Sequence, residues 1–481
     1  MQHSLALSID TWAFGADNQG IWRNDGEDYT NWQALAGLPR SSRYNGRWAV
    51  ADLDKFFAHL LAQRAPVTAL VTGDDRLLCK VGVGNHEFVS IQRFGYESGA
   101  KGAYGAQHAA ELRLWLHDNQ WKLRTSVGGC GFFDVLPALT ALGQWGIQVP
   151  GPLVSFLKPL CMAGREFCIP GEYNHTEHYD IKSAYASCAR DLSFPEPKTL
   201  GRVIPRTKGD AMRIIRTRNG AAMITIRLPV DEYGLLPVTT PYGIDWMCDG
   251  GTVSGTWANN EIAYAIGLGA ELIKCEWVII GACEGKYLEE FALSTFEEKE
   301  AAKSANDLAG GRFWKRLFNA TLGRLAAEGD VWTAHLVPYG KTAVPLPKGA
   351  TGLLCHHPYI FWLRREVYPG NGNRLWTAIV IAEQRARHHA ALTRSKAMYG
   401  FTDSVICRSG DFHETIGQQI GQWELKAQGS AIIRNVGTYQ IGDGEPHARG
   451  IEAASAAAAV LGEPIVISRE RKWHLATLTP R

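Results

Sequence analysis

The chain has 481 residues, of which 46% are hydrophobic and 20% charged, so it has the composition of a globular protein and the length for roughly two to four domains. Its 50 basic and 48 acidic residues leave a formal net charge of +2. This total neither requires nor excludes nucleic acid, because a binding groove can hold its cations locally. The ten cysteines show no CxxC pair or zinc-ligand spacing, which excludes the common zinc modules.

No stretch approaches the roughly 18 apolar residues of a membrane-spanning helix. The N-terminal segment lacks the basic start, apolar run and cleavage site of a secretory leader. We therefore expect a cytoplasmic protein with no membrane association, whose scattered cysteines are reduced and act as small buried apolar residues.

The first 150 residues read as an α/β domain. Residues 3–12 and 67–72 have strand-like patterns, and 52–64 have apolar residues at helical spacing. Residues 129–149 join a strand-like CGFF to a helix-like segment.

The middle of the chain mixes strands and helices. We expect a strand over 221–228 (AAMITIRL) and a helix over 257–269 that stops at glycine. The longest helical candidate is 285–330, which Gly310 and Gly311 are expected to divide into two antiparallel helices.

The last third begins with the turn-rich stretch 331–375, in which 337–352 is expected to form a hairpin or a loop insert. A helix is expected over about 375–398, followed by a strand, a turn and a strand over 398–412. An alanine-rich helix is expected over 451–462.

Certain residues have the chemistry that phosphoryl transfer requires. Two divalent cations must be held by converging carboxylates, and cationic side chains must hold a triphosphate. Asp180 at the end of a predicted strand and Asp403 in the strand–turn–strand segment supply the carboxylates. Lys299, Lys303 and Lys315 lie on the long helical stretch.

Three segments occur in the order of motifs A, B and C of the family B DNA polymerases and resemble them. Residues 180–187 (DIKSAYAS) resemble DxxSLYPS, 315–323 (KRLFNATLG) resemble KxxxNSxYG, and 398–404 (MYGFTDS) resemble YxDTDS. Lys303 precedes Lys315 by 12 residues, as in the two fingers helices of that family.

The resemblance implies an α/β and α+β multidomain fold, a right-hand polymerase with palm, fingers and thumb behind an N-terminal RNase H-like exonuclease-type domain. The implied domains are the exonuclease-type domain (1–150), palm (151–200), an insert resembling terminal-protein region 1 (201–290), fingers (291–330), an insert resembling terminal-protein region 2 (331–374), palm (375–445) and thumb (446–481). Inserts at these two places resemble those of the protein-primed polymerases of phages and linear plasmids.

The implied activity is that of a DNA-directed DNA polymerase adding dNTPs to a primer 3′ end. Asp180, Asp403 and the Ile181 carbonyl would hold Mg²⁺ or Mn²⁺, with Lys315 as a further catalytic residue. The implied nucleotide-binding residues are Tyr185, which selects deoxynucleotides, Lys299, Lys303, Lys315 and Asn319. The implied DNA contacts are Arg165, Gly323, Thr402, Ser404 and Tyr439. The implied partners of this monomer are primer–template DNA, dNTPs and a terminal (priming) protein.

Several positions depart from the family pattern. Phe401 replaces the first Asp of motif C, which should weaken metal or primer-end binding without abolishing chemistry. Ala320 and Leu322 replace the Ser and Tyr of motif B, so templating is expected to be relaxed. Gly437 replaces the Lys of the primer-gripping Lys-x-Tyr.

The opening domain departs further from the pattern. Trp12 stands where the exonuclease-type domain has Glu, after Asp10. Asp74, Asp75 and Asp134 do not complete the roughly three to four converging acids of a two-metal hydrolytic site, so we expect no proofreading.

Alternative interpretations stay open. In the first alternative, the chain is a loosely templated or self-priming, terminal-transferase-like polymerase. In the second, it is a catalytically silent DNA-binding subunit derived from a polymerase. Arg165 is either a template contact or a structural residue. His388 and His389 indicate a basic DNA-facing or palm-supporting helix rather than a metal site, because no acid or Cys follows at ligand spacing.

Overall fold

The structure is a computed structural model. It describes residues 11–17, 20–24, 29–31, 68–71, 87–90, 94, 111–112, 114–121, 130–140, 142, 146–240, 243–327, 330–338, 352–356, 359–367, 372–449 and 453–462. The helix predicted over 52–64 lies outside these residues, as do Asp10, Asp74 and Asp75.

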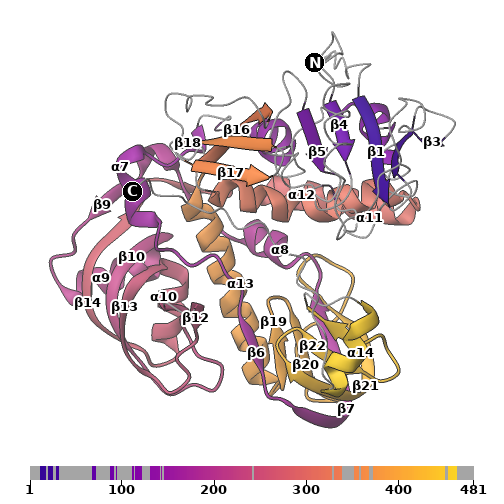
Figure 1. The fold of residues 1–481 in the computed structure, drawn as a ribbon. Coiled ribbons are helices and arrows are strands. Elements are labelled where there is room, and N and C mark those ends of the chain that lie inside the picture. Colours follow the sequence, from indigo (N-terminus) through magenta and orange to yellow (C-terminus); the bar gives the residue numbers. More distant parts are fainter. Residues whose placement is uncertain are drawn as a thin grey trace.

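The N-terminal part contains a mixed five-stranded sheet (Figure 1). Its strands are β1 (Thr11–Asp17), β2 (Gly20–Asn24), β3 (Tyr29–Asn31), β4 (Thr68–Val71) and β5 (Glu87–Ser90). In the order β3-β2-β1-β4-β5, the first three strands are antiparallel, and β1, β4 and β5 are parallel. The strand predicted over 67–72 is confirmed by β4, and the sheet agrees with an α/β opening domain.

A seven-stranded sheet, called the palm sheet below, contains the segments of motifs A and C. Its order is β23-β22-β21-β7-β20-β19-β6. The strands are β6 (Glu166–Cys168), β7 (Gly171–Ile181), β19 (Tyr399–Phe401), β20 (Ser404–Arg408), β21 (Trp423–Asn435), β22 (Thr438–Ile441) and β23 (His447–Ala448). The predicted strand–turn–strand is confirmed by β19 and β20. Strand β23 extends this sheet into residues that the sequence assigns to the thumb.

One face of the palm sheet is covered by helix α13 (Arg374–Arg394), which begins where the Asn373 side chain accepts the Trp376 N–H. Tyr179 and Ile181 of β7 pack in one cluster with Leu392 of α13. Because side chains alternate along a strand, His178 and Asp180 face the opposite side. The helix predicted over 375–398 is thereby confirmed, although it ends four residues earlier.

The insert at 201–290 folds as a four-stranded antiparallel sheet, β13-β10-β14-β9, with two helices. Its elements are β9 (Gly201–Val203), α9 (Lys208–Thr217), β10 (Gly220–Leu228), β11 (Val238–Thr240), β12 (Gly243–Asp245), β13 (Gly251–Ala258), α10 (Asn259–Gly267), β14 (Glu271–Ile280) and β15 (Glu284–Gly285). The strand and helix predicted here are confirmed by β10 and α10. The chain leaves α10 through Gly269, whose φ of +98° suits glycine.

The insert packs against the side of α13 (Figure 1) through buried polar contacts. Arg385 of α13 makes a two-pronged ion pair with Glu261 of α10, at 2.6 and 2.7 Å. His389 lies between the Tyr264 hydroxyl and the Asp231 carboxylate, 2.9 Å from each. The two histidines of α13 are therefore buried and support the palm; they do not face DNA.

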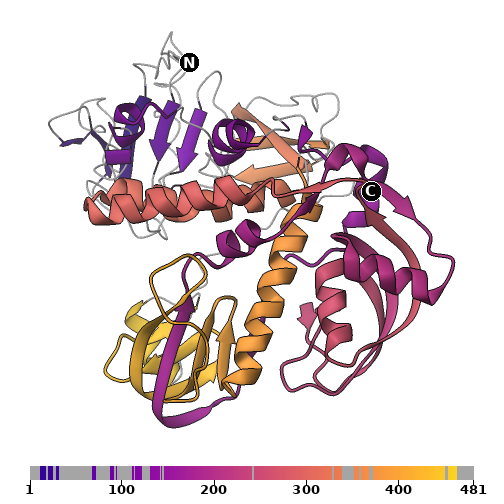
Figure 2. The same ribbon diagram turned by 180° about the vertical axis from the view of Figure 1, so that it is seen from behind.

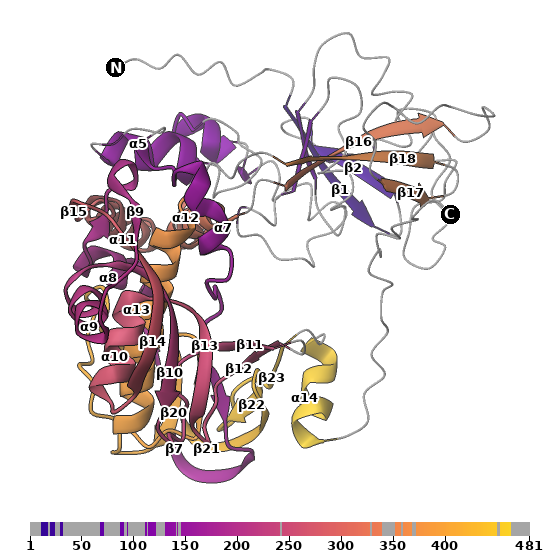
Figure 3. The same ribbon diagram turned by 90° about the vertical axis from the view of Figure 1, so that its left-hand side faces the viewer.

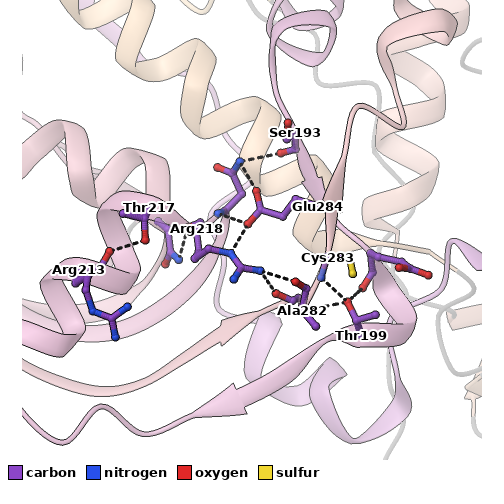
Figure 4. A network of polar contacts seen from close by, with 12 residues as sticks. Ser193, Thr199, Arg213, Thr217, Arg218, Ala282, Cys283 and Glu284 are labelled. Carbon is purple, nitrogen blue, oxygen red and sulfur yellow. Dashed lines mark hydrogen bonds and ion pairs between the residues drawn. The ribbon is translucent and has the colours of Figure 1, made fainter.

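A second polar network fixes the base of the insert (Figure 4). Arg218 Nε donates to Glu284 Oε1 at 3.0 Å, and the same oxygen accepts the Asn219 N–H. The Asn219 amide also donates to the Ser193 carbonyl at 2.9 Å. Residues that lead out of the palm are thus tied to the strand that returns from the insert.

The fingers are two antiparallel helices, α11 (Glu289–Ser304) and α12 (Leu308–Ala326), whose Phe291 and Phe318 rings stack. The break predicted at Gly310 and Gly311 is wrong, since both glycines lie inside α12. The chain turns instead at Asn306, with φ of +53°, and Asp307 caps α12 by accepting the Gly310 N–H.

The predicted CGFF strand is also wrong. Residues Gly131–Val135 form a π-helical turn that continues into α5 (Leu136–Leu139). Gly131 packs so tightly on Thr321 of α12 that a Cβ would lie 1.8 Å from the Thr321 hydroxyl. Contact with the fingers therefore overrides the local strand preference.

The remaining elements complete the molecule (Figure 2 and Figure 3). They are α7 (Gly151–Leu157), α8 (Ala184–Asp191), β8 (Phe194–Pro195), η3 (Pro197–Thr199), β16 (Asp330–Pro338), β17 (Gly352–His356), β18 (Tyr359–Val367) and α14 (Ala453–Leu461). Strand β18 lies between β16 and β17. The hairpin or loop insert predicted over 337–352 falls mostly outside the described residues. The alanine-rich helix is confirmed by α14. Among the described residues, no helix has the length and apolar character to cross a membrane.

Candidate active site

Asp180 and Asp403 lie together at one edge of the palm sheet. Strands β7 and β20 are antiparallel with Asp180 opposite Ser404, and the Ile181 N–H donates to the Asp403 carbonyl at 2.9 Å. Thr402 makes the turn before Asp403, with φ of +56°. The predicted convergence of the two aspartates from motifs A and C is thus present in the fold.

The two carboxylates are poorly stabilised as anions. Burial, followed by the negative charge of Asp180, raises the pKa of Asp403 to about 7. Burial also raises the pKa of Asp180. A divalent cation between them would relieve both effects and return the carboxylates to their charged form.

The donor set fits a hard divalent cation held by two carboxylates. Oxygen ligands of this kind suit Mg²⁺ and Mn²⁺. In the part of the chain that the structure describes, no group of three or more His, Cys, Asp or Glu side chains is placed to hold a metal. The two aspartates, with the Ile181 carbonyl as the predicted third ligand, are therefore the candidate set.

Helix α12 presents its motif B residues on one exposed face. Lys315, Asn319 and Gly323 recur every four residues and are exposed, whereas Phe313 and Leu317 on the other side are buried. The positive charge of Lys315 lowers the pKa of both aspartates, against the larger effect of burial. Lys315 is therefore within electrostatic reach of the carboxylate pair.

The two lysines of α11 differ in environment. Lys303 is exposed near the end of the helix. Lys299 donates to the Ser183 hydroxyl at 2.8 Å and pairs with Glu300 at 3.1 Å, and burial lowers its pKa. In this structure Lys299 thus joins the fingers to motif A, and its contact with a nucleotide stays a prediction.

Tyr185 of motif A lies in the first turn of α8 and is half-buried. Burial, followed by the charge of Asp403, raises its pKa to about 12. The side chain is therefore a neutral phenol near the carboxylate pair.

Tyr439 of β22 lies on the same sheet face as Asp180. Its ring contacts those of His178, Tyr399 and His447, with centroids 5.7, 4.9 and 5.1 Å away. Burial, and then the charge of Asp180, raises its pKa.

Glu424 is a neighbour of the site that sequence reasoning missed. It lies opposite Asp180 on β21 and forms ion pairs with Lys182, at 3.4 Å, and Lys426. The charge of Lys426 opposes the effect of burial on Asp180. Only the strand register brings Glu424 and Lys426 of β21 to Asp180, so no motif could have found them.

Arg165, for which a DNA contact and a structural role were both expected, lies inside the protein. Its guanidinium is buried, donates to the carbonyls of Tyr233, Gly234 and Leu235, and lies 4.1 Å from the Trp246 ring centroid. Burial lowers its pKa to about 10. Its burial and these backbone contacts favour the structural alternative, and a DNA contact of Arg165 stays a prediction.

Thr402 and Ser404 build the turn that carries Asp403. The Thr402 N–H donates to the Arg165 carbonyl at 2.7 Å, and its own carbonyl accepts from Gln384 at 3.1 Å. The Ser404 hydroxyl donates to the Phe401 carbonyl at 3.2 Å. Their DNA contacts stay predictions.

The predicted absence of proofreading also stays a prediction. Asp134 is half-buried in the turn that packs on α12. The other candidate acids lie outside the described residues.

Comparison with known proteins gives two kinds of match, while no protein-family model matches the chain. The sequence is 26% identical over 209 residues to the DNA-directed DNA polymerase of Enterobacteria phage PRD1. That alignment covers 42% of this chain and 36% of the phage protein, so the match spans about a third of the length of that polymerase.

The fold is similar to that of phi29 DNA polymerase. Its orthorhombic crystal form superimposes with a TM-score of 0.63 at 12% identity, covering 92% of each chain. Its ternary complex with primer–template DNA and incoming nucleotide substrates gives 0.62 at 12%, covering 92% of this chain and 91% of that one. The right-hand polymerase fold is thereby confirmed, and part of the sequence is similar to that of a phage DNA polymerase.

Proposed function

We propose that this chain is a DNA-directed DNA polymerase that adds dNTPs to a primer 3′ end. The observation that carries the proposal is the convergence of Asp180 and Asp403 at one edge of the palm sheet, within electrostatic reach of Lys315. Two half-buried carboxylates beside a cationic helix suit the binding of metal ions and a triphosphate.

Asp180, Asp403 and the Ile181 carbonyl would hold Mg²⁺, with Mn²⁺ as the alternative ion. When bound, the ions lower the pKa of the attacking 3′ hydroxyl and neutralise charge on the leaving pyrophosphate. The turn contacts of Thr402 hold the Asp403 backbone in place before substrate arrives. This positioning limits the reorganisation needed during reaction.

The fingers supply the cationic side of the site. Lys303 and Lys315 are exposed and bind the triphosphate, and Asn319, one turn after Lys315, lines the pocket for the nascent base pair. Gly323 continues this face toward the template. Lys299 donates to Ser183 of motif A and pairs with Glu300, and its third N–H is the donor that would face the triphosphate.

Tyr185 selects the sugar. Its ring is positioned by helix α8, and its neutral phenol lies near Asp403. A rigid aromatic ring beneath the sugar excludes a 2′ hydroxyl by steric contact. We therefore propose preference for deoxynucleotides.

DNA reaches the site over the palm face that bears Tyr439, with Thr402 and Ser404 at its edge. The insert formed by 201–290 has its own four-stranded sheet and is joined to α13 by the buried Arg385–Glu261 ion pair. Such a folded unit supports an interaction role, such as binding a priming protein. Priming by a terminal protein, a monomeric state, a cytoplasmic location and the absence of proofreading stay predictions from the sequence.

One observation that favoured the loosely templated alternative, the substitution at Leu322, is explained by the core packing. Leu322, which replaces the motif B Tyr, is buried in the main core, and its carbonyl accepts from Thr377 at 3.0 Å. The side chain at this position therefore faces the interior. The silent-subunit alternative does not account for the unneutralised Asp180–Asp403 pair, which is costly unless a cation binds.

Primer extension tests the proposal. The purified chain is incubated with labelled primer on a longer template, dNTPs and Mg²⁺ or Mn²⁺, with Asp180→Asn and Asp403→Asn in parallel. Lanes with NTPs and without primer report sugar and primer requirements. We expect extension to the template end, reduced by about 10³-fold or more in both variants, since loss of a metal ligand removes several kcal/mol of transition-state stabilisation. Equal extension by wild type and both variants would contradict the proposal.

A further inference from the structure

Arg449 links the two positions where the palm departs most from the motif pattern. Gly437 has φ of +76°, and a Cβ there would lie 2.8 Å from the Arg449 Cβ. The Arg449 N–H donates to the Gly437 carbonyl at 2.8 Å. The guanidinium carbon of Arg449 lies 5.0 Å from the centroid of the Phe401 ring. One side chain therefore occupies the space beside the missing Lys and rests on the aromatic ring that replaces Asp.

The curl of the palm sheet makes this contact possible. Although β22 and β19 are separated by three strands, the Gly437 N–H donates to the Tyr399 hydroxyl at 3.1 Å. The turn between β21 and β22 thus folds over toward β19. It brings Arg449, just after β23, to the strand that leads into Asp403.

Arg449 lies on the same side of the sheet as the candidate active site. Tyr439 packs with Phe401 in one cluster on this side, and its ring contacts that of His178. His178 and Asp180 alternate with residues that face α13, so they share this side. Phe401 precedes Asp403 by two residues.

The Arg449 guanidinium is accessible. Its side chain is 62% exposed, and its ion pair with Glu166, at 2.9 Å, joins two solvent-facing groups. Such a pair contributes little and is easily exchanged. By contrast, Lys182 and Lys426 near Asp180 are both paired with Glu424.

We propose that Arg449 binds a backbone phosphate of the primer strand near its 3′ end, with the Phe401 ring as the platform under the guanidinium. This inference rests on the proposed polymerase function. A strand whose 3′ end meets Asp180 and Asp403 must place its backbone along this sheet face. A guanidinium binds phosphate with two parallel hydrogen bonds and stacks on an aromatic ring at the same time. The substitutions at 401 and 437 are thus parts of one relocated phosphate contact.

The test is the salt dependence of binding to a labelled primer–template DNA, measured without divalent metal. Arg449→Gln keeps the aliphatic contact with Gly437 but removes the charge. We expect about tenfold weaker binding and a loss of about one from the slope of log affinity against log salt. Arg449→Lys keeps the slope. Arg394→Gln, which removes an arginine paired with Glu414 at the end of α13, is the matched control and leaves both quantities unchanged.

Glu166→Gln separates phosphate binding from a structural clasp between β6 and the chain after β23. If Arg449 binds DNA, loss of the competing carboxylate tightens binding, opposite to the effect of Arg449→Gln. If the ion pair is only a clasp, both variants lower thermal stability alike and leave the salt slope intact, which overturns the inference. Wild-type protein that extends primers while Arg449→Gln retains the full slope overturns this inference alone. Wild-type protein that neither binds nor extends primers overturns the proposed function as well.

Discussion

The palm sheet has a polar cluster on each side, and the two clusters are built by opposite rules. Between α13 and the insert, Arg385 and Glu261 form a buried ion pair, and His389 has a partner at each ring nitrogen. On the other side, burial raises the pKa of both Asp180 and Asp403, and the negative charge of Asp180 raises the pKa of Asp403 further. Satisfied groups hold the fold together, whereas the unsatisfied pair is available to a substrate or an ion.

The same chemical change on each side should have opposite consequences. Glu261→Gln leaves the buried Arg385 charge without its partner, so we expect a loss of about 3–5 kcal/mol in the free energy of unfolding. Asp403→Asn removes one of two like charges and should leave that free energy unchanged or higher. Denaturant unfolding of both variants without metal measures the difference. Equal destabilisation by the two amides would remove the contrast between the clusters.

The pH dependence of metal-free protein sharpens the contrast. The pKa of Asp403 rises from 3.8 to about 7 on folding, so the folded state binds the proton more tightly than the unfolded state. Its contribution to stability is therefore present below about pH 4 and is lost as pH rises toward 7. Thermal unfolding in a chelator should show this loss. Asp403→Asn should show a smaller loss, because burial also raises the pKa of Asp180.

Adding Mg²⁺ at pH 7 should restore the lost stability in the wild type alone, because a bound cation stabilises the ionised pair. A melting temperature that ignores both pH and Mg²⁺ would argue against a metal site between the aspartates.

A charged residue beside the Asp180–Asp403 pair should affect substrate binding more than folding. Lys315 is exposed, so Lys315→Ala should change the unfolding free energy by less than about 0.5 kcal/mol. The KM for dNTP should rise about 10- to 100-fold, since a charge-assisted contact with the triphosphate is lost. Arg316→Ala, its exposed neighbour, is the control in steady-state primer extension.

The smallest expected effect is that of a substitution in the polar cluster between α13 and the insert. Tyr264→Phe removes the hydroxyl that lies 2.9 Å from His389 Nδ1, at an expected cost of about 1 kcal/mol. Unfolding measurements should detect this loss, while kcat for primer extension stays at the wild-type value. A fall in kcat without a change in stability would instead connect this cluster to catalysis.

Prediction from the sequence succeeded where local patterns or motif spacing were sufficient. The helix at 375–398 and the strands around Asp403 follow from periodicity and are confirmed. Motif order predicted that Asp180 and Asp403 converge, which the strand register shows, whereas the catalytic roles of Asp180, Asp403 and Lys315 stay predictions. Gly310 does not break the helix, because α12 already begins at Leu308, after the capping residue Asp307. An Asp at this position is a helix-start signal that the sequence contains.

Other features depend on contacts between distant parts of the chain. Residues 130–133 became helical against α12, and Glu424 reached Asp180 only through strand register. The internal role of Arg165 required the carbonyls of 233–235, about 70 residues away. No local pattern contains that information.

Arg165 also limits how this protein can be shortened. Its guanidinium holds three carbonyls of the insert, while its own carbonyl holds Thr402 beside Asp403. Cutting out 201–290 to shorten the chain would leave the buried Arg165 cation without these partners, directly behind the turn that carries Asp403. A minimal version therefore has to keep the loop that contains 233–235, or replace Arg165 with an apolar side chain in the same step.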